Sequence, residues 1–327
     1  CIMLFFFNGY NIELGIILSI LASAGFAGSL VFYNAYLPVI ATPDKYDFVS
    51  ARGFSLGYLG SVLLLIFNLV MITYPDKFGL ENESMASRIS FLLVGFWWIG
   101  FSQITFYFLP KDTRKPGGIQ SLVIKGYKEI RKVFLSLNKQ VHLSRFLIAF
   151  FFYNMGVQTV IYLAALFGDA ELGLSANSLI VTIIIIQVVA IAGSYFFAKV
   201  SQLKGNKFSL MLMVIIWMII CVYAYFMHSA LQFYVLGFIV GLVLGGIQSL
   251  SRASYSKLIP ANTNDTTSYF SFYDVIEKLS IVLGTFAYGF IEQLTGSMRS
   301  STLALASFFV IGLIVLSLLK IPKTQKV

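Results

Sequence analysis

Charged side chains are scarce in this sequence of 327 residues. Only 11% of its residues are Asp, Glu, Lys or Arg, whereas soluble domains contain about 25%. Hydrophobic residues make up 58%. A soluble fold of this size needs a polar shell, and this composition cannot supply one. The composition therefore excludes a cytosolic enzyme and a disordered chain, and it predicts a protein that is surrounded by lipid.

Histidine and cysteine are also rare. The chain has two cysteines, Cys1 and Cys221, and two histidines, His142 and His228. Both cysteines lie in apolar runs, which excludes a disulfide framework. The two histidines are far apart in the sequence. We therefore expect no metal site, no catalytic residues and no cofactor. A phosphate-binding loop for ATP is also missing, so the sequence does not predict primary active transport.

Long apolar runs separated by short polar breaks dominate the rest of the chain. A helix needs about 20 apolar residues to cross a bilayer, and period-two alternation typical of barrel strands is absent. Residues 1–7 are too few to span, and we interpret them as the tail of a helix whose beginning is missing. The sequence predicts nine complete transmembrane helices, at about 13–40, 54–74, 90–110, 146–167, 179–200, 208–227, 231–251, 267–291 and 301–320.

The net charge of +9 is distributed unevenly between the loops. Nineteen of the 23 Lys and Arg residues lie in one alternating set of loops, which includes the C-terminus, and three lie in the opposite set (Lys77, Arg88 and Arg299). Cytoplasmic loops carry such an excess of cations, so we expect a cytoplasmic C-terminus. Because these cations are spread over short loops beside the membrane, they indicate contact with lipid and no binding of nucleic acid.

One long loop, 111–145, divides the chain. Its first part, Lys111–Gly118, is rich in helix breakers. In its second part Val123, Tyr127, Ile130, Phe134 and Leu137 recur at helical spacing, opposite a basic face. This pattern is typical of a helix in the membrane interface, and equally of a lid packed on the helical bundle.

The same loop separates two groups of predicted helices. We predict an N-terminal bundle remnant at 1–110 (the end of helix 3 to helix 6), a basic cytoplasmic linker at 111–145, and a six-helix bundle at 146–327. Two six-helix halves joined by such a linker are typical of secondary transporters.

Three ionisable residues, Asp274, Glu277 and Lys278, lie within a predicted span. At about 1.5 Å per residue, Lys278 is roughly 16 Å from the cytoplasmic end of the helix. Ionisable groups at this depth are costly and usually functional. They could bind an anionic group or carry a coupling proton; alternatively, they form an ion pair that stabilises the bundle.

Neutral polar residues form a second set of candidates for substrate binding. Asn154, Gln158 and Tyr162 recur on one face of a predicted span, and Tyr33, Asn34 and Gln248 lie on other spans. Each could simply form a hydrogen bond between helices. Together they favour a solvated central cavity.

Small residues recur at helical spacing in one span, at Gly237, Gly241 and Gly245. Such a stripe lets helix backbones approach closely. It indicates either close packing or helices that slide during gating.

The loop after 179–200 is similar to the cytoplasmic gating motif of the major facilitator superfamily. Ser201, Gly205 and Lys207 match that motif, whereas Gln202 stands at the position of its aspartate. The missing carboxylate predicts a weakened latch.

Longer strings specify the resemblance: 33–38 (YNAYLP), 49–60 (VSARGFSLGYLG), 245–252 (GGIQSLSR) and 268–274 (SYFSFYD). They resemble the branch of this superfamily that joins fungal autophagy-related vacuolar amino-acid effluxers with bacterial relatives of unassigned substrate. The resemblance implies an all-α membrane protein with a two-bundle fold of twelve helices, of which about nine are complete here. It also implies alternating-access transport and suggests amino-acid export.

The superfamily's plan, in which helices 1, 4, 7 and 10 line the cavity, implies roles for the polar candidates. Tyr33 and Asn34 would belong to helix 4, the Asn154 stripe to helix 7 and Gln248 to helix 10. Lys278 and its neighbours would belong to helix 11, beside the gate.

We therefore expect a secondary transporter of small solutes in a bacterial plasma membrane, with a proton as coupling ion, and not an enzyme. One alternative is a receptor or scaffold with the same fold and no transport. A membrane-embedded lipid-modifying enzyme would need converging catalytic groups; the nearest are Asp44 and Asp47. Lys45 and Arg52 beside them indicate a solvated loop instead.

Overall fold

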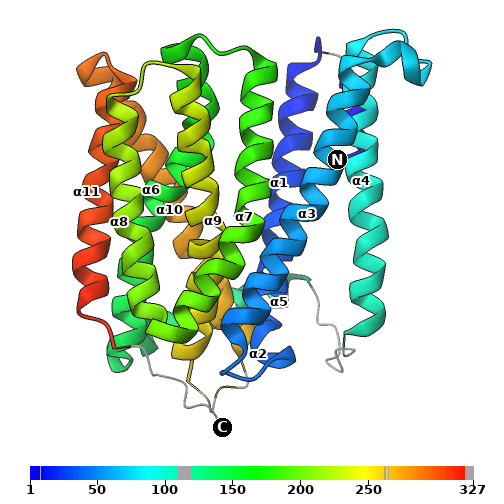
Figure 1. Ribbon diagram of the computed structural model, residues 1–327. Helices are drawn as coiled ribbons and strands as arrows, with labels where there is room; N and C mark the ends of the chain where they lie inside the picture. The colour runs from blue at the N-terminus through cyan, green and yellow to red at the C-terminus, as the bar shows by residue number, and fades with distance from the viewer. Residues whose placement is uncertain (8, 110–118, 261–262, 264, 321–327) are drawn as a thin grey trace. The chain divides into compact units, whose positions relative to one another are not determined.

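The chain is described by a computed structural model that covers residues 1–7, 9–109, 119–260, 263 and 265–320. Every regular element in these ranges is helical (Figure 1). The chain divides into two compact units, which are described separately. The first comprises Cys1–Leu30 with Gly60–Lys125, and the second comprises Val31–Leu59 with Gly126–Val327.

Nine long helices occupy the nine predicted spans in the described part of the chain, and this confirms the predicted all-α class. They are α1 (Ile12–Ala35), α3 (Tyr46–Thr73), α4 (Glu83–Phe108), α6 (Val141–Leu172), α7 (Ala176–Lys204), α8 (Asn206–Tyr225), α9 (Ala230–Leu258), α10 (Thr266–Thr295) and α11 (Met298–Ser317). The short helix α2 (Leu37–Ile40) follows α1, and α5 (Ile119–Ser136) lies in the predicted linker.

Eight helices in the described ranges are long and apolar enough to cross a membrane. The helix α10, although 30 residues long, is not among them, and it carries the charged residues Asp274, Glu277 and Lys278. The helix α9 continues to Leu258, seven residues beyond the predicted end. This extension places Arg252 and Lys257 inside a helix, whereas the sequence had suggested a loop.

Local sequence signals explain several helix ends. Ser229 and Gln232 form a reciprocal capping box at the start of α9, which satisfies backbone N–H groups that lack partners within the helix. Gly173 and Gly296 end α6 and α10 with φ values of 61° and 65°. Only glycine adopts this left-handed conformation without a steric penalty.

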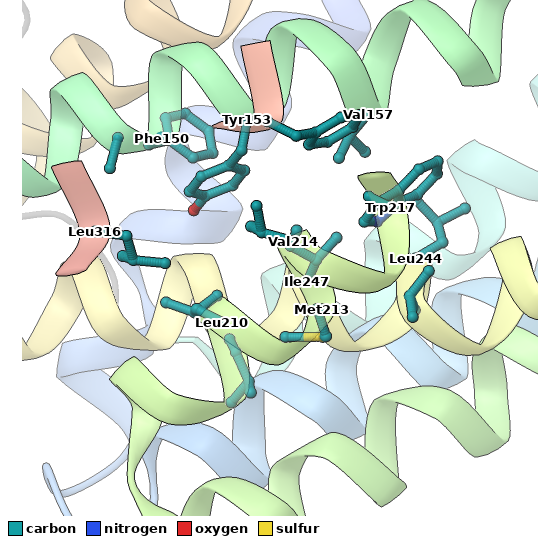
Figure 2. Close-up of a cluster of buried hydrophobic side chains, with 14 of the residues drawn as sticks. Phe150, Tyr153, Val157, Leu210, Met213, Val214, Trp217, Leu244, Ile247 and Leu316 are labelled. Carbon is teal, nitrogen blue, oxygen red and sulfur yellow. The ribbon is translucent and has the colours of Figure 1, made fainter. Parts of the chain in front are cut away.

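The core of the second unit is apolar and closely packed. Figure 2 shows a cluster of side chains from α6, α8, α9 and α11 that includes Trp217, which is fully buried. The ring of Phe309 stacks on Trp217 with a centroid distance of 5.9 Å, and a Cβ on Gly156 would collide with the Phe309 ring. Such dense apolar packing resists rearrangement, so this part of the unit is expected to behave as a rigid body.

The glycine stripe of α9 lies against α7. A Cβ on Gly241 or Gly245 would collide with the backbone carbonyl oxygen of Ile186 or Ala190, and a Cβ on Gly193 would collide with the Leu242 carbonyl. These contacts agree with the close-packing interpretation of the stripe. Sliding of the two helices during gating stays a prediction.

The linker helix α5 has features of both alternatives, the lid packed on the bundle and the helix in the membrane interface. Val133 is buried, and Ile130 and Leu137 pack against the core of the second unit, as in a lid. Tyr127 and Phe134, however, are 69% and 60% exposed. Residues 110–118 and the side chains of 119–125, which include Val123 of the predicted stripe, lie outside the described residues.

Residues Ile2–Phe6 form a 3-10 helix, whereas the sequence had suggested the tail of an α-helix. In the first unit this segment lies against α4. Arg88 Nε donates a hydrogen bond of 2.5 Å to the Phe5 carbonyl oxygen.

Candidate functional site

A largely polar stripe runs along the first four turns of α3. Asp47, Ser50, Phe54 and Tyr58 follow one another at intervals of three or four residues, which places them on one helix face. Within the second unit this face contacts the last turns of α9. The stripe organises two buried groups of polar side chains, one around Asp47 and one around Arg252.

The first group is centred on an ion pair between α3 and α9. Lys257 Nζ lies 2.9 Å from Asp47 Oδ1, and the two side chains are only 6% and 5% exposed. Ser201 Oγ donates to Asp47 Oδ2 at 3.0 Å, and Asn206 Nδ2 donates to Oδ1 at 2.7 Å. Lys257 Nζ also donates to Asn206 Oδ1 at 2.9 Å. Both charges are therefore paired and hydrogen-bonded.

The helix ends add to the stability of this pair. Asp47 lies in the first turn of α3 and Lys257 in the last turn of α9. The helix dipole favours an anion at the first position and a cation at the second. A buried charge that loses its partner is strongly destabilising, so each residue depends on the other.

The segment similar to the gating motif supplies the other two hydrogen-bond donors to Asp47. Ser201 lies in the last turn of α7, and Gly205 forms the turn into α8 with φ 92°. Ser201 and Asn206 thus both reach Asp47. Gln202 is exposed and does not take part in the cluster. The carboxylate that the motif lacks at 202 is thus provided by Asp47 of α3.

Lys207, the basic residue of the same segment, has a different partner. Its Nζ donates a hydrogen bond of 2.5 Å to the carbonyl oxygen of Ser317, the last residue of α11. A cation at a helix C-terminus is stabilised by the unpaired carbonyl groups there.

The second group surrounds Arg252, which is 4% exposed. Its Nε donates to Ser50 Oγ at 2.9 Å and its Nη2 to the Ser50 carbonyl oxygen at 3.1 Å. Its Nη1 makes only a long bond of 3.4 Å to Asn34 Oδ1. The rings of Tyr33 and Phe54 lie over the guanidinium with centroid distances of 4.6 and 4.8 Å.

Two further contacts extend this group along α9. Ser50 Oγ donates to the Ser249 carbonyl oxygen at 2.7 Å, and Tyr58 OH donates to Gln248 Oε1 at 2.5 Å. Gly53 is required at this position because a Cβ there would collide with the Tyr33 hydroxyl and contact Arg252. The structure thus brings together the predicted residues Tyr33 and Asn34, with Gln248 nearby on α9.

The charged cluster of α10 is a third and separate group. Lys278 Nζ lies 3.5 Å from Asp274 Oδ1 and 3.7 Å from Glu277 Oε1. The Lys278 side chain is 38% exposed. Asn154 Nδ2 of α6 donates to Ser280 Oγ at 2.6 Å, and Ser280 Oγ donates to the Glu277 carbonyl oxygen at 2.7 Å, which joins Asn154 to this cluster.

The residues of the predicted polar stripe on α6 differ in how deeply they are buried. Asn154 and Gln158 are 5% and 9% exposed, whereas Tyr162 is 61% exposed. The candidate residues thus contribute to several groups and do not form a single site within the described residues.

The family model described as "Vacuole effluxer Atg22 like" matches residues 1–326. The chain belongs to this family.

Individual relatives agree with that membership. The chain is 32% identical over 304 residues to the "Uncharacterized MFS-type transporter YxiO" of Bacillus subtilis, covering 90% of this chain and 68% of that protein. It is 27% identical over 296 residues to "Autophagy-related protein 22-1" of Aspergillus clavatus, covering 82% of this chain and 47% of the relative. The chain therefore spans about two thirds of the first protein and about half of the second.

Solved structures show the same fold at lower identity. The E. coli fucose:proton symporter FucP matches with a TM-score of 0.66 and 15% identity, covering 94% of this chain and 77% of that one. A bacterial homologue of the iron transporter ferroportin matches with a TM-score of 0.57 and 12% identity, covering 93% and 72%. This Atg22-like chain thus has the fold of the major facilitator superfamily, as predicted. It belongs with multi-pass membrane transporters and not with enzymes.

Sequence reasoning missed the central residues of the two main groups. Asp47 was interpreted as part of a solvated loop, and that interpretation is wrong because Asp47 is 4% exposed. Arg252 and Lys257 were counted as loop cations, but both are buried in α9. The polar spacing of 47, 50 and 58 on one face of α3 is the signal that could have revealed them.

Proposed function

We propose that this Atg22-like protein is a secondary transporter of small solutes that works by alternating access, and that the Asp47–Lys257 cluster is its cytoplasmic latch. The observation that supports this most strongly is the buried ion pair between α3 and α9. It joins residues 210 positions apart in the chain, and it is completed by the α7–α8 turn.

The contrast between this cluster and the apolar core supports the assignment. Helices α6, α8, α9 and α11 meet through densely packed apolar side chains. The start of α3 meets α9 mainly through charged and polar groups, beside a small apolar cluster of Leu37, Tyr46 and Ala253. Water can replace hydrogen bonds and ion pairs when a contact opens, but it cannot replace apolar packing at low cost. A contact that must open in every transport cycle is expected to be polar.

The distribution of cations supports the cytoplasmic assignment of the latch. The start of α3 and the end of α9 flank loops of the cation-rich set, which the positive-inside rule places in the cytoplasm. On this proposal, residues 1–110 and 146–327 are the two halves, 111–145 is the linker, and the protein resides in a bacterial plasma membrane.

A proton is the proposed coupling ion, because two carboxylates share one ammonium group on α10. When Asp274, Glu277 and Lys278 are all ionised, the cluster carries a net negative charge within a span. Binding of one proton would neutralise this excess charge, which is costly within a membrane.

Amino acids are the proposed substrates, because the sequence resembles vacuolar amino-acid effluxers and the matching family model is described as a vacuole effluxer. Counterflow of a mixed pool of labelled amino acids into proteoliposomes containing the full-length protein tests this proposal. We expect flux that rises when a pH gradient is imposed. Flux without any response to the gradient would contradict proton coupling, and a lack of flux for every solute would favour a non-transporting receptor.

A further inference from the structure

Two cations from neighbouring helices meet at the C-terminal end of α11. Arg145 Nη1 of α6 donates a hydrogen bond of 3.1 Å to the Leu318 carbonyl oxygen, and Lys207 Nζ of α8 donates one of 2.5 Å to the Ser317 carbonyl oxygen. Figure 1 shows the end of α11 beside the starts of α6 and α8. We propose that this pair, the Arg145–Lys207 clamp, binds the headgroup of an anionic phospholipid.

Both cations of the clamp keep hydrogen-bond donors free for a ligand. A guanidinium has five N–H donors and an ammonium has three. Within the described residues each side chain makes a single hydrogen bond and no ion pair. Arg145 is exposed and Lys207 is half-buried, so a headgroup can reach both from the surface. Phosphate oxygens accept such charge-assisted hydrogen bonds.

No acidic residue lies near the clamp in the sequence. Asp and Glu are absent from 130–168, 172–264 and 293–327, the stretches that contain both cations and all of α8 and α11. Lys320 adds an exposed cation two residues beyond Leu318. The carbonyl groups at the end of α11 carry only about half a negative charge. This end therefore keeps a net positive charge, which an anionic headgroup would neutralise.

An apolar stripe on α11 leads away from the clamp and favours a lipid over a soluble anion. Ile311, Ile314 and Leu318 recur at intervals of three or four residues, which places them on one helix face. They are 38%, 58% and 58% exposed, as expected for side chains that contact acyl chains. A phospholipid joins an anionic group to such chains, so one molecule could occupy both the clamp and the stripe.

The location of the clamp agrees with this partner. Arg145, Lys207 and Lys320 all belong to the cation-rich set of loops and helix ends, which the positive-inside rule places on the cytoplasmic side. The cytoplasmic leaflet contains anionic lipids, and basic sites between transmembrane helices on this side bind their headgroups. The inference concerns a lipid and does not depend on the transported solute.

The experiment is a lipid titration of the full-length protein in detergent, with bound lipids counted by native mass spectrometry. The probes are phosphatidylglycerol, phosphatidylcholine with the same acyl chains, and glycerol phosphate as a soluble headgroup. We expect the first phosphatidylglycerol to bind with a dissociation constant about 10- to 30-fold lower than that of phosphatidylcholine, because two surface cations each favour an anionic lipid. Glycerol phosphate should bind more weakly than phosphatidylglycerol.

Variants assign this preference to the clamp. Arg145→Gln and Lys207→Gln should each lower it about three- to fivefold, and the double variant should lower it to less than about threefold in total. The matched control is Lys128→Gln combined with Lys199→Gln, which removes two exposed cations of α5 and α7. This control has the same net charge as the double variant and should keep the wild-type preference.

Four results would overturn the inference. They are equal binding of phosphatidylglycerol and phosphatidylcholine, binding of glycerol phosphate as tight as that of phosphatidylglycerol, a full preference in either single variant, and an equal loss in the control. The last result would show diffuse attraction by a basic face. If the double variant does not fold, the single variants still decide. None of these results bears on solute flux, so the proposed transport function is tested separately.

Discussion

The Asp47 carboxylate accepts hydrogen bonds from three side chains on three other helices or turns. Ser201, Asn206 and Lys257 all reach it at 2.7–3.0 Å, so the carboxylate has almost no contact with water. The contribution of the Asp47 charge to stability therefore depends on those partners. This makes Asp47 the residue where a small chemical change has the largest expected effect.

Replacing Asp47 with Asn removes the charge and keeps the shape. Lys257 is then buried without a counter-ion, and we expect a loss of about 3–5 kcal/mol of stability, measured by denaturant unfolding of the full-length protein in detergent. Asp47→Asn combined with Lys257→Met should recover most of this loss, because no unpaired charge remains. Asp169→Asn, at an exposed position, is the control. Equal stability of Asp47→Asn and the control would contradict the buried pair.

Lys278 is the residue-scale test of the α10 cluster. Its removal takes away the cation that both Asp274 and Glu277 contact, and with it the ion pairing on which the proposed proton coupling depends. Lys278→Ala should therefore abolish proton-coupled transport in proteoliposomes. The unfolding temperature should hardly change, because the Lys278 side chain is 38% exposed. Unchanged uptake kinetics would exclude a role for this residue, and Lys199→Ala at an exposed position controls for loss of a surface cation.

At the scale of the elements, the helices α7 and α9 pack through their glycines. Gly245→Ala places a methyl group against the Ala190 carbonyl, and overpacking of this kind costs about 1–3 kcal/mol. Gly289→Ala on α10 is the matched control, because a Cβ there meets nothing within 4 Å. We expect this control to raise stability by about 0.5–1 kcal/mol through helix propensity. Thermal unfolding of the two variants gives the comparison.

The helices themselves could be predicted from the sequence, because each apolar run is long enough to span and must satisfy its own backbone. Their ends were less predictable. The α9 prediction stopped near residue 251 because Arg252 and Lys257 resemble the polar edge of a loop. In the structure these residues are buried against α3, and burial with suitable partners keeps a charged turn helical inside the bundle.

At the scale of the whole molecule, the distribution of cations determines orientation. With nineteen cations in one set of loops and the helix ends beside them, and three in the other set, we expect a cytoplasmic C-terminus. A fusion of green fluorescent protein to the C-terminus should fluoresce in bacterial cells, whereas a fusion of alkaline phosphatase should be inactive. An active phosphatase fusion would reverse the orientation and move the proposed latch to the other face.

The sequence by itself determined the lipid-embedded class, the number and order of the helices, and the resemblance that the family match confirms. These features follow from local composition and from runs of neighbouring residues. Only the tertiary structure decided which polar residues meet. Asp47 and Lys257, or Ser50 and Arg252, are about 200 positions apart. Their pairing depends on how the helices pack, and the residue spacing within one helix does not indicate which other helix it contacts. The low charge content thus identified a membrane protein, and burial in the structure identified Asp47, Arg252 and Lys257 as its interacting charges.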